Sequence, residues 1–465
     1  MTQSISKVNT GPLLFIICLG SSLVPFMGSA LNLALPHINE DLSLNAVMSG
    51  WIPTSYMLST AILQIPCARM ADMIGRRKVF LGGVILLTIF SILSGLATTG
   101  TSLIVYRFLS GIGSAMMFGT STAILTSSVP AETRGKALGA IAATVYFSLA
   151  AGPFLGGLLT QYLNWHSIFF VAAALSLIVA IGGYVIIKED WKEEKKTKFD
   201  IIGSVLFAIG LSSLIFGFSE LPHIPGFVFI GVGIAVLLYF GIYEKKQEHP
   251  VFNIRVFLEN RVFRLSSVSA LINYSATFAI SFMLSLYLQY VRGLSPRDAG
   301  LILIVQSVVQ AVASLKSGSL SDKMSATFLS TLGMGIIAVG LIGLCFISET
   351  TSLYLLSGIL VLLGLGFGIF SSPNTNIIMS SVEKKHYGLA SATMGTMRLT
   401  GQAFSMGIAI MAISLIVGNV KISPAVHAEL IGSMRITFII CFILCLFGVY
   451  ASSVREKKNE KAESK

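Results

Sequence analysis

The sequence predicts an all-α polytopic membrane protein, and two observations lead to this fold class. First, only 11% of the 465 residues are charged and 54% are hydrophobic, whereas a soluble domain carries about 25% charged residues. Second, uncharged apolar runs of about 20 residues recur along the whole chain, and each is long enough to cross a bilayer as a helix. A transmembrane β-barrel would instead show short segments of alternating polarity.

Fourteen apolar runs are expected to be transmembrane helices. They cover residues 13–33, 51–68, 79–98, 102–125, 138–160, 167–187, 201–219, 226–243, 265–288, 299–315, 328–347, 353–372, 388–416 and 433–452. Two charged connections, 188–200 and 244–264, flank the seventh and eighth runs. The predicted parts are a six-helix bundle at 1–187, an inserted two-helix hairpin with its linkers at 188–264, a second six-helix bundle at 265–452 and a charged tail at 453–465.

The distribution of basic residues predicts the orientation in the membrane. The net charge is +11. If the N-terminus is cytoplasmic, most Lys and Arg fall in loops on that side, and the opposite loops keep only Arg292, Arg297 and Lys421. By the positive-inside rule, both termini are expected in the cytoplasm and the protein in the cytoplasmic membrane. The basic charge therefore reflects topology, and no nucleic-acid partner is expected.

The first apolar run and the five cysteines lead to two further expectations. The first run is longer than the core of a signal peptide and lacks an A-x-A-like cleavage site, so we expect it to be a retained span. The five cysteines lie in or beside apolar runs, without the paired spacing of metal ligands. No metal and no other cofactor is therefore expected.

A weak internal repeat relates the two groups of six spans. "ARMADM" follows the second span of the first group and contains Asp72, and "GSLSDK" follows the second span of the later group and contains Asp322. Parallel repeats of this kind place a substrate site near the midplane, between the halves. Asp322 is expected to matter less than Asp72, because no Gly-Arg-Arg follows it.

Charged residues gather in the short loop between the second and third spans, "ARMADMIGRRKVF". A topology signal needs only basic residues, yet this loop also contains Asp72 and Gly75. Asp72 can accept hydrogen bonds at a helix N-terminus or from an Arg, and Gly75 lets the backbone turn. Because Arg76 and Arg77 can pair with another span, we expect a polar latch that forms in one conformation and acts as a gate.

This loop resembles the cytoplasmic signature of the major facilitator superfamily, G-x-L-A-D-R-x-G-R-R, with Ala68 in place of the first Gly. "YRFLSGIGSA", from Tyr106, resembles the fourth-span motif of the same superfamily, with Ser110 where Gln is common. The resemblance implies that its Arg107 takes part in proton coupling. The alternative is that Arg107 extends to the outer interface, about 8 Å away at 1.5 Å per residue.

"SLAAGPFLGG", from Ser148, resembles the fifth-span antiporter motif G-x-x-x-G-P-x-x-G-G, with Ser148 for its first Gly. Pro153 frees a backbone carbonyl within the span. Gly152, Gly156 and Gly157 allow neighbouring helices to approach closely. Tight packing is expected in any case, and the functional hypothesis is that this bend controls leakage and the outward gate.

"LNLALP", at 31–36, resembles the end of the first span in the fourteen-span drug:proton antiporters. This resemblance implies a major-facilitator fold of two six-helix bundles plus an inserted hairpin. The family commonly has an acidic residue in the first span, but Met27 occupies that place, and no Asp or Glu falls in the central part of any span. With Arg107 and Arg398 within spans, the cavity is expected to be neutral to electropositive and to prefer neutral or anionic amphiphiles over quaternary ammonium dyes.

Polar and aromatic residues within spans are candidates for the transport pathway, although such a residue more often packs or hydrogen-bonds between helices. Arg398 is expected to contact substrate or another span. The uncharged polar candidates are Asn32, Gln64, Asn273, Gln306, Gln310, Asn374, Asn376 and Gln402. The aromatic candidates are Tyr146, Phe147, Tyr274 and Tyr287.

Together these features predict a secondary active transporter that exports small amphiphilic compounds by alternating access coupled to protons. Its expected partners are a small-molecule substrate, protons and the lipid bilayer, and the protein is expected to be a monomer. One alternative is an exporter or facilitator of neutral or anionic metabolites without proton–drug antiport. Another is a membrane receptor or scaffold on a transporter fold. No P-loop, dinucleotide or H-E-x-x-H motif is present, so no enzyme is expected.

Overall fold

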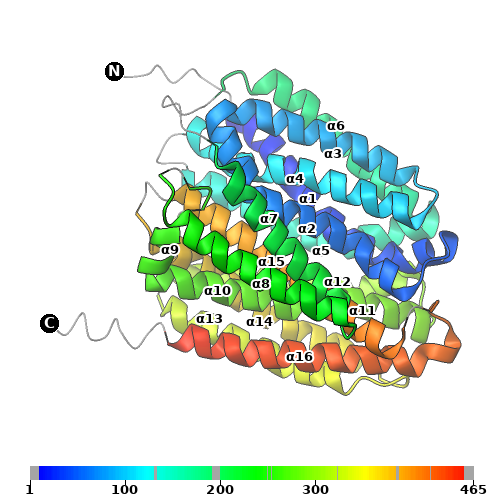
Figure 1. The fold of residues 1–465 in the computed structure, drawn as a ribbon. Helices are drawn as coiled ribbons and strands as arrows, with labels where there is room; N and C mark the ends of the chain where they lie inside the picture. Colours follow the sequence, from blue (N-terminus) through cyan, green and yellow to red (C-terminus); the bar gives the residue numbers. More distant parts are fainter. Residues whose placement is uncertain are drawn as a thin grey trace, which may run out of the picture.

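The computed structural model describes residues 10–129, 134–190, 199–248, 250–252, 254–321, 323–383, 387–418 and 420–454, and within them the fold is built of helices (Figure 1). The first half contains α1 (Thr10–Asp41), α2 (Ala46–Ile74), α3 (Arg76–Gly95), α4 (Gly100–Ser128), α5 (Arg134–Tyr162) and α6 (His166–Ile186). The hairpin consists of α7 (Ile201–Ser219) and α8 (Ile224–Glu244), followed by the short α9 (Ile254–Glu259). The second half contains α10 (Arg261–Thr277), α11 (Ala279–Leu286), the π-helical turn η1 (Tyr287–Val291), α12 (Pro296–Leu320), α13 (Ala326–Cys345), α14 (Leu353–Ser380), α15 (Tyr387–Ile416), the short 3-10 turn η3 (Pro424–Val426) and α16 (His427–Ser453).

The all-α membrane fold predicted from the sequence is confirmed. In the described residues, 12 helices are long and apolar enough to cross a membrane, or 13 if the bent helix α5 is one span. The expected total of fourteen exceeds this number by α2, which has 29 residues. At 1.5 Å per residue, α2 is about 44 Å long and can cross the bilayer. The helix is less apolar than the others because it has Ser and Thr side chains in its middle. These side chains are buried inside the bundle.

The helices pack as two groups of six that meet along two seams. In the first half, α1 packs on α5, and α4 lies between α2 and α3. In the second half, α14 packs on α12 and α13, while α10 packs on α15 and α16. The seams between the halves are formed by α2 with α15 and by α5 with α12.

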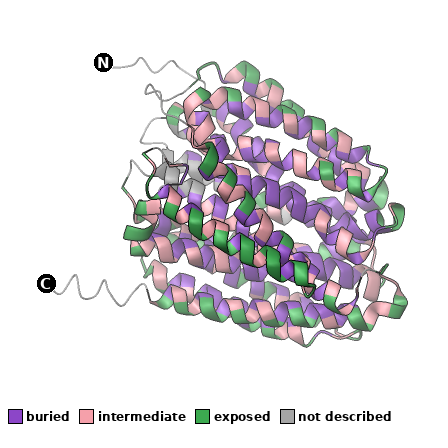
Figure 2. Ribbon diagram, viewed as in Figure 1, coloured by how far each residue is buried: buried purple, intermediate pink, exposed green. Residues whose placement is uncertain are grey.

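The hairpin α7–α8 lies outside this double bundle, across the seam of α2 and α15 (Figure 1). Only 28% of the most apolar stretch of α7 and 17% of that of α8 are buried, compared with 72% for α1. The exposed faces of the hairpin are visible in Figure 2, and their exposed side chains include Ile209, Leu238 and Tyr239. These apolar faces are suited to contact with lipid.

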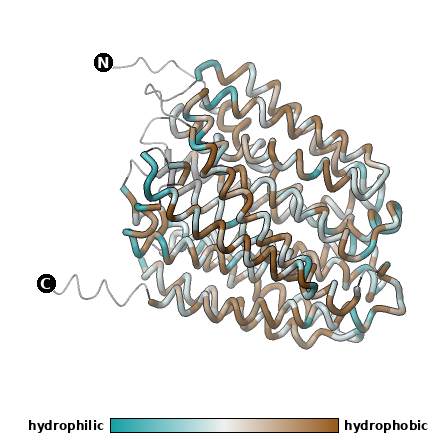
Figure 3. Tube along the Cα trace, in the orientation of Figure 1, coloured by the Kyte–Doolittle hydropathy of each residue, from teal (hydrophilic) through white to brown (hydrophobic). Residues whose placement is uncertain are grey.

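The start of α1 and the end of α16 lie at one end of the bundle, called here the termini end (Figure 1). The opposite end, called the far end, contains the loops after α1, α3 and α5. Hydrophilic residues concentrate at the two ends, and hydrophobic residues cover the middle of the helices (Figure 3). This pattern is that of a bundle set upright in a bilayer.

Side-chain caps fix several helix starts. Asn45 Oδ1 accepts from the backbone N–H of Met48 at 2.7 Å at the start of α2. Thr99 and Ser102 form a capping box at the start of α4. Such caps satisfy N–H groups that have no partner within the helix.

Candidate functional site

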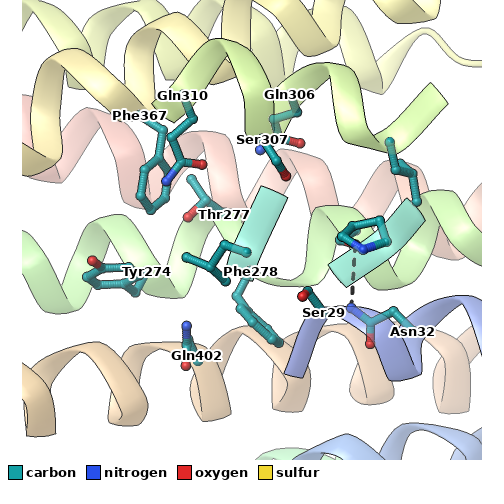
Figure 4. A pocket seen from close by; sticks show the side chains of 14 residues that line it. Ser29, Asn32, Tyr274, Thr277, Phe278, Gln306, Ser307, Gln310, Phe367 and Gln402 are labelled. Atoms are coloured by element: carbon teal, nitrogen blue, oxygen red, sulfur yellow. Dashed lines mark hydrogen bonds between the residues drawn. The ribbon is translucent and has the colours of Figure 1, made fainter. Parts of the chain in front are cut away.

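A central cavity lies between the two halves (Figure 4). Its walls come from α1, α5, α10, α11, α12, α14 and α15, so both halves contribute. The lining residues are Ser29, Asn32, Leu149, Pro153, Tyr274, Thr277, Phe278, Ser281, Leu303, Gln306, Ser307, Gln310, Phe367 and Gln402.

The cavity lining contains amides, hydroxyls and aromatic rings, and none of its residues is charged. Gln306, Ser307 and Gln310 extend from α12 toward the middle of the cavity, and Gln402 extends from α15 on the other side (Figure 4). The predicted neutral to electropositive cavity is therefore neutral, because neither Arg107 nor Arg398 is part of its wall. Amides and aromatic rings fix the orientation of a solute without requiring it to be charged.

Three of the predicted site residues line this cavity: Asn32, Pro153 and Gln306. Tyr274, Gln310 and Gln402 also line it, as the sequence suggested. The sequence did not single out the small hydroxyl residues Ser29, Thr277, Ser281 and Ser307, nor the rings of Phe278 and Phe367. Residues of these types occur throughout the spans, and only the rotation of each helix decides which of them face the cavity.

Asn32 joins the cavity to the contact between the halves. Its Nδ2 donates to Ser281 Oγ at 3.5 Å (Figure 4), and its backbone oxygen accepts from Ser285 Oγ at 2.6 Å. Its Oδ1 is buried and has no donor among the described residues. A solute that supplies an N–H or O–H group at this point would satisfy that oxygen.

At the far end, hydrogen bonds between α1 and the helix running through α11 and η1 close the space between the halves. Tyr290 Oη donates to the backbone oxygen of Pro36 at 3.2 Å and accepts from Asn39 Nδ2 at 3.5 Å. Gln289 Nε2 donates to the backbone oxygen of Leu33 at 3.1 Å. These bonds connect the first and second halves directly.

Glycines around Pro153 allow α5 to lie against α1. A bend of 40° separates the segments Ala143–Leu149 and Ala151–Tyr162 of α5. A Cβ added to Gly156 would come within 3 Å of three backbone atoms of Ala30 on α1. A Cβ added to Gly152 would collide with the side chain of Ser29 on α1.

Gly157 has a different neighbour, because it faces the second half. A Cβ added there would lie 2.5 Å from the backbone oxygen of Pro296 on α12. Gly300 of α12 approaches the backbone oxygen of Pro153 in the same way, at 2.8 Å from an added Cβ. The "SLAAGPFLGG" segment therefore packs on its own half through one face and on the other half through another.

The loop between α2 and α3 is held by ionic and polar contacts within the first half. Arg76 Nε lies 2.8 Å from Asp72 Oδ1. The same guanidinium donates from Nη1 to Ser127 Oγ at 2.8 Å and to the backbone oxygen of Ala123 at 3.3 Å, both on α4. Arg76 therefore connects the end of α2 to the end of α4.

Arg77 connects the same loop to the end of α6. Its side chain donates to the backbone oxygens of Ile187 and Tyr184, and its backbone N–H donates to Asp190 Oδ1 at 3.0 Å. Gly75 has φ +120°, and a side chain at this position would collide with the Asp190 carboxyl group. Sequence reasoning missed Asp190, because it appeared only as part of a charged linker.

The comparisons with known proteins fit this geometry. A family model described as Major Facilitator Superfamily matches residues 17–406. The chain belongs to this superfamily. It is therefore a transporter of the major facilitator type and not an enzyme.

Several transporters of the superfamily are similar over most of their length. The riboflavin transporter RibZ of Clostridioides difficile is 28% identical over 455 residues, which are 97% of this chain and 98% of RibZ. The multidrug resistance protein Stp of Mycobacterium tuberculosis is 28% identical over 88% of this chain and 75% of Stp. The cephamycin export protein CmcT of Amycolatopsis lactamdurans is 30% identical over 88% of this chain and 86% of CmcT.

The fold is also that of a solved major facilitator structure. A bacterial homolog of the human lysosomal transporter Spinster, described as inward-facing and unoccupied, superimposes with a TM-score of 0.69. The superposition covers 96% of this chain and 97% of that protein at 16% sequence identity. The agreement therefore concerns the fold alone.

In this major facilitator protein, Arg107 lies inside the first half and away from the central cavity. The side chain is 0% exposed. Its guanidinium stacks 4.0 Å from the ring centroid of Tyr56 on α2 and 5.9 Å from that of Phe169 on α6. Its three nitrogens have no hydrogen-bond acceptor among the described residues. The extension to the outer interface that the sequence left open is therefore not observed.

Arg398 and Gln64 lie at the seam between α2, α4 and α15. The Arg398 guanidinium is 4.9 Å from the ring centroid of Phe118 on α4, so it connects the two halves. A Cβ added to Gly395 on α15 would collide with the Gln64 amide of α2. Both side chains thus belong to the interface of the halves, outside the cavity wall.

The other predicted residues lie elsewhere or outside the described part. Asn273 Nδ2 donates to Met334 Sδ at 3.2 Å, and Asn374 Nδ2 donates to the backbone oxygen of Ser266 at 3.2 Å. Both are contacts between helices of the second half. Asp322 and the side chain of Tyr146 lie outside the described residues.

Proposed function

We propose that this protein is a secondary active transporter that exports small, neutral or weakly anionic amphiphiles by alternating access coupled to protons. The observation that carries the proposal is the central cavity, which is lined by four amides, three aromatic rings and no charged group. The superfamily supplies the transport activity, whereas the class of solute follows from the lining.

A flat heterocycle with polar edges matches this lining best. Aromatic rings such as Tyr274, Phe278 and Phe367 provide faces for stacking. Amides such as Gln306 and Gln402 both donate and accept, so they can pair with the carbonyl and N–H groups at a ring edge. A flavin has these features, and the similarity to RibZ makes riboflavin the first compound to test.

A lipophilic cation would find no opposite charge in the cavity. Moving a cation out of water without a counter-charge costs several kcal/mol. Aromatic faces recover about 2 kcal/mol or more at a desolvated site. Neutral solutes are therefore preferred over quaternary ammonium compounds.

Alternating access requires that contacts at the two ends form in turn. The bonds from Tyr290 to α1 close the far end. Because most basic residues of the described loops lie at the termini end, we place that end in the cytoplasm and the protein in the cytoplasmic membrane. The arrangement is thus the state closed toward the outside, and the contacts of Asp72, Arg76 and Arg77 are proposed to hold the first half together as it moves.

The same proposal includes the organisation of the chain. The division into bundles at 1–187 and 265–452, with the hairpin and linkers at 188–264, follows the packing of the helices described above. The cavity is complete within one chain, which supports a monomer as the transporting unit.

Transport into proteoliposomes tests the proposal. Purified protein should take up riboflavin saturably, and an imposed proton gradient should raise the initial rate severalfold above that with a protonophore. Gln306→Leu should raise KM about tenfold, as expected for a lost hydrogen bond to a desolvated partner. Asn376→Ala removes an amide that bonds Ser321 outside the cavity and is the matched control.

The outcomes separate the alternatives. An uptake rate that the protonophore does not change would support a facilitator without proton antiport. If neither riboflavin nor any neutral or anionic aromatic compound moves, a receptor or scaffold becomes the better description. Saturable export of a dication that is unaffected by Gln306→Leu would refute the assignment of a neutral cavity.

A further inference from the structure

Two acidic side chains face each other at the termini end of the hairpin, and neither of them lines the central cavity. Asp200 caps the start of α7, and Glu244 is the last residue of α8. A Cβ added to Gly203 would lie within 3 Å of both Glu244 Oε1 and Asp200 Oδ2. The two carboxyl groups are within hydrogen-bonding reach of each other.

Glu244 is almost completely buried, with 2% of its surface exposed. One of its oxygens, Oε2, accepts from the backbone N–H of Phe252 at 3.0 Å. Asp200 Oδ1 accepts from the N–H of Gly203 at 2.8 Å and from Tyr243 Oη at 3.2 Å. The remaining oxygens, Glu244 Oε1 and Asp200 Oδ2, are buried and find no donor among the described residues.

Among the described residues, no cation compensates two negative charges at this place. The ionisable side chains on the neighbouring elements are Arg69 on α2, Tyr239 and Tyr243 on α8, Lys245, Lys246 and Glu248 after α8, and Arg255 on α9. Within the described residues, no basic side chain forms an ion pair with either acid. Lys245 and Lys246 are exposed, and Arg255 donates to the backbone oxygen of Lys245.

We propose that Asp200 and Glu244 form a proton-binding site that holds one proton between Glu244 Oε1 and Asp200 Oδ2. Two ionised carboxylates at this distance repel each other, and burial strengthens the repulsion. One proton converts the pair into a donor and an acceptor and satisfies both unpaired oxygens. The proton comes from water at the termini end, and it returns there when the pair ionises.

The proton is linked to the packing of the connection between the hairpin and the second half. Glu244 Oε2 accepts a hydrogen bond from the backbone N–H of Phe252. Phe252 packs in a small apolar cluster with Val251, Phe240 of α8 and Ile65 of α2. The chain then continues through α9 to α10. When the pair ionises, Glu244 is drawn toward water and Phe252 loses its acceptor, so the connection detaches from α2.

The hairpin contacts both halves, so a movement of one half relative to the other involves the contact between Glu244 and Phe252. The helix α7 packs on both α2 and α15, so the hairpin lies across the seam of the two halves (Figure 1). The cavity itself contains no titratable carboxyl group. The site at the hairpin therefore gives the protein a proton-sensitive contact that is separate from the place where a solute binds.

Hydrogen–deuterium exchange of the full-length protein in nanodiscs tests the proposal without any substrate. The quantity is the protection factor of peptides that contain Phe252, measured from about pH 5 to about pH 9 and corrected for the exchange of an unstructured peptide at each pH. In the wild type, protection should be high at low pH. It should fall by up to roughly tenfold per pH unit as the pair ionises, which is the limit for one proton.

Glu244→Gln is the decisive variant. Its amide can accept from Phe252 and donate to Asp200, so it imitates the protonated pair, and protection should stay high at every pH. Asp200→Asn should do the same while it keeps an N-cap residue at α7. Glu259→Gln, an exposed acid on α9, is the matched control and should titrate like the wild type.

The opposite results would overturn the inference. A wild-type protection factor that does not change with pH means that no proton is bound there over this range. A pH profile of Glu244→Gln equal to that of the wild type means that another group titrates. If both variants lose protection at all pH values while their helix content and elution volume are normal, the two acids have a purely structural role.

Discussion

Arg107→Met should make the protein more stable and less active. The guanidinium is 0% exposed and has no hydrogen-bond acceptor among the described residues. An unpaired buried charge costs several kcal/mol. The stack on Tyr56, at 4.0 Å from its ring centroid, returns about 2 kcal/mol. The charge therefore lowers the free energy of unfolding, and its presence within a span points to a function.

The expected magnitude follows from these terms. A buried Met side chain of similar length contributes about 2 kcal/mol by apolar burial and removes the uncompensated part of the desolvation cost. We expect a gain of about 2 kcal/mol in the free energy of unfolding and a fall of the initial transport rate by about tenfold or more. Arg107→Lys should keep part of the transport activity, since it retains the charge.

The assay combines thermal unfolding in detergent with transport into proteoliposomes at equal protein content. Arg435→Met is the matched control, because Arg435 is exposed at the far end and donates to the backbone oxygen of Ile347. It should change the stability by about 1 kcal/mol or less and leave transport intact. If Arg107→Met unfolds more easily than the wild type, the side chain stabilises the first half and the reasoning from its desolvation is refuted.

Two further predictions concern the loop after α2 and the packing of α5. Asp72→Asn should lower the transport rate severalfold with little change in thermal stability, because a partly exposed ion pair such as Asp72–Arg76 contributes about 1 kcal/mol or less. Unchanged transport at equal protein level would leave the loop with a role in topology alone. Gly156→Val should destabilise the protein by about 1–3 kcal/mol, because its Cβ would collide with the backbone of Ala30. Gly335→Val on α13 is the control for the change of residue type, because an added Cβ there meets nothing within 4 Å. Equal melting temperatures of the two variants would contradict the close approach of α5 and α1.

Sequence patterns predicted the spans well, because a helix that crosses the lipid bilayer needs about 20 consecutive, mainly apolar residues. Apolar runs gave the helices of both halves and the hairpin at 188–264, and the structure has helices at each of them. The run at 51–68 corresponds to α2, although the buried Ser and Thr side chains in its middle make this helix less apolar than the others. Motif spacing also pointed to the loop at Asp72 and to the glycines around Pro153.

The pathway was predicted only in part. Among the residues singled out, Asn32, Pro153 and Gln306 line the cavity, whereas Asn273 and Asn374 bond neighbouring helices instead. A polar residue in a span satisfies its hydrogen bonds either with another helix or with the cavity, and both uses have the same local pattern. The partner of each such residue is therefore set by the rotation of its helix.

The sequence by itself determined the class of the fold and the positions of the spans, because both depend on the polarity of consecutive residues. It also determined that no carboxylate could lie in the middle of a span. Only the tertiary structure decided that Arg107 stacks on Tyr56 away from the cavity, and that Asp200 meets Glu244 across the hairpin. These pairs are separated by many residues in the chain, and their meeting depends on how whole helices pack against one another.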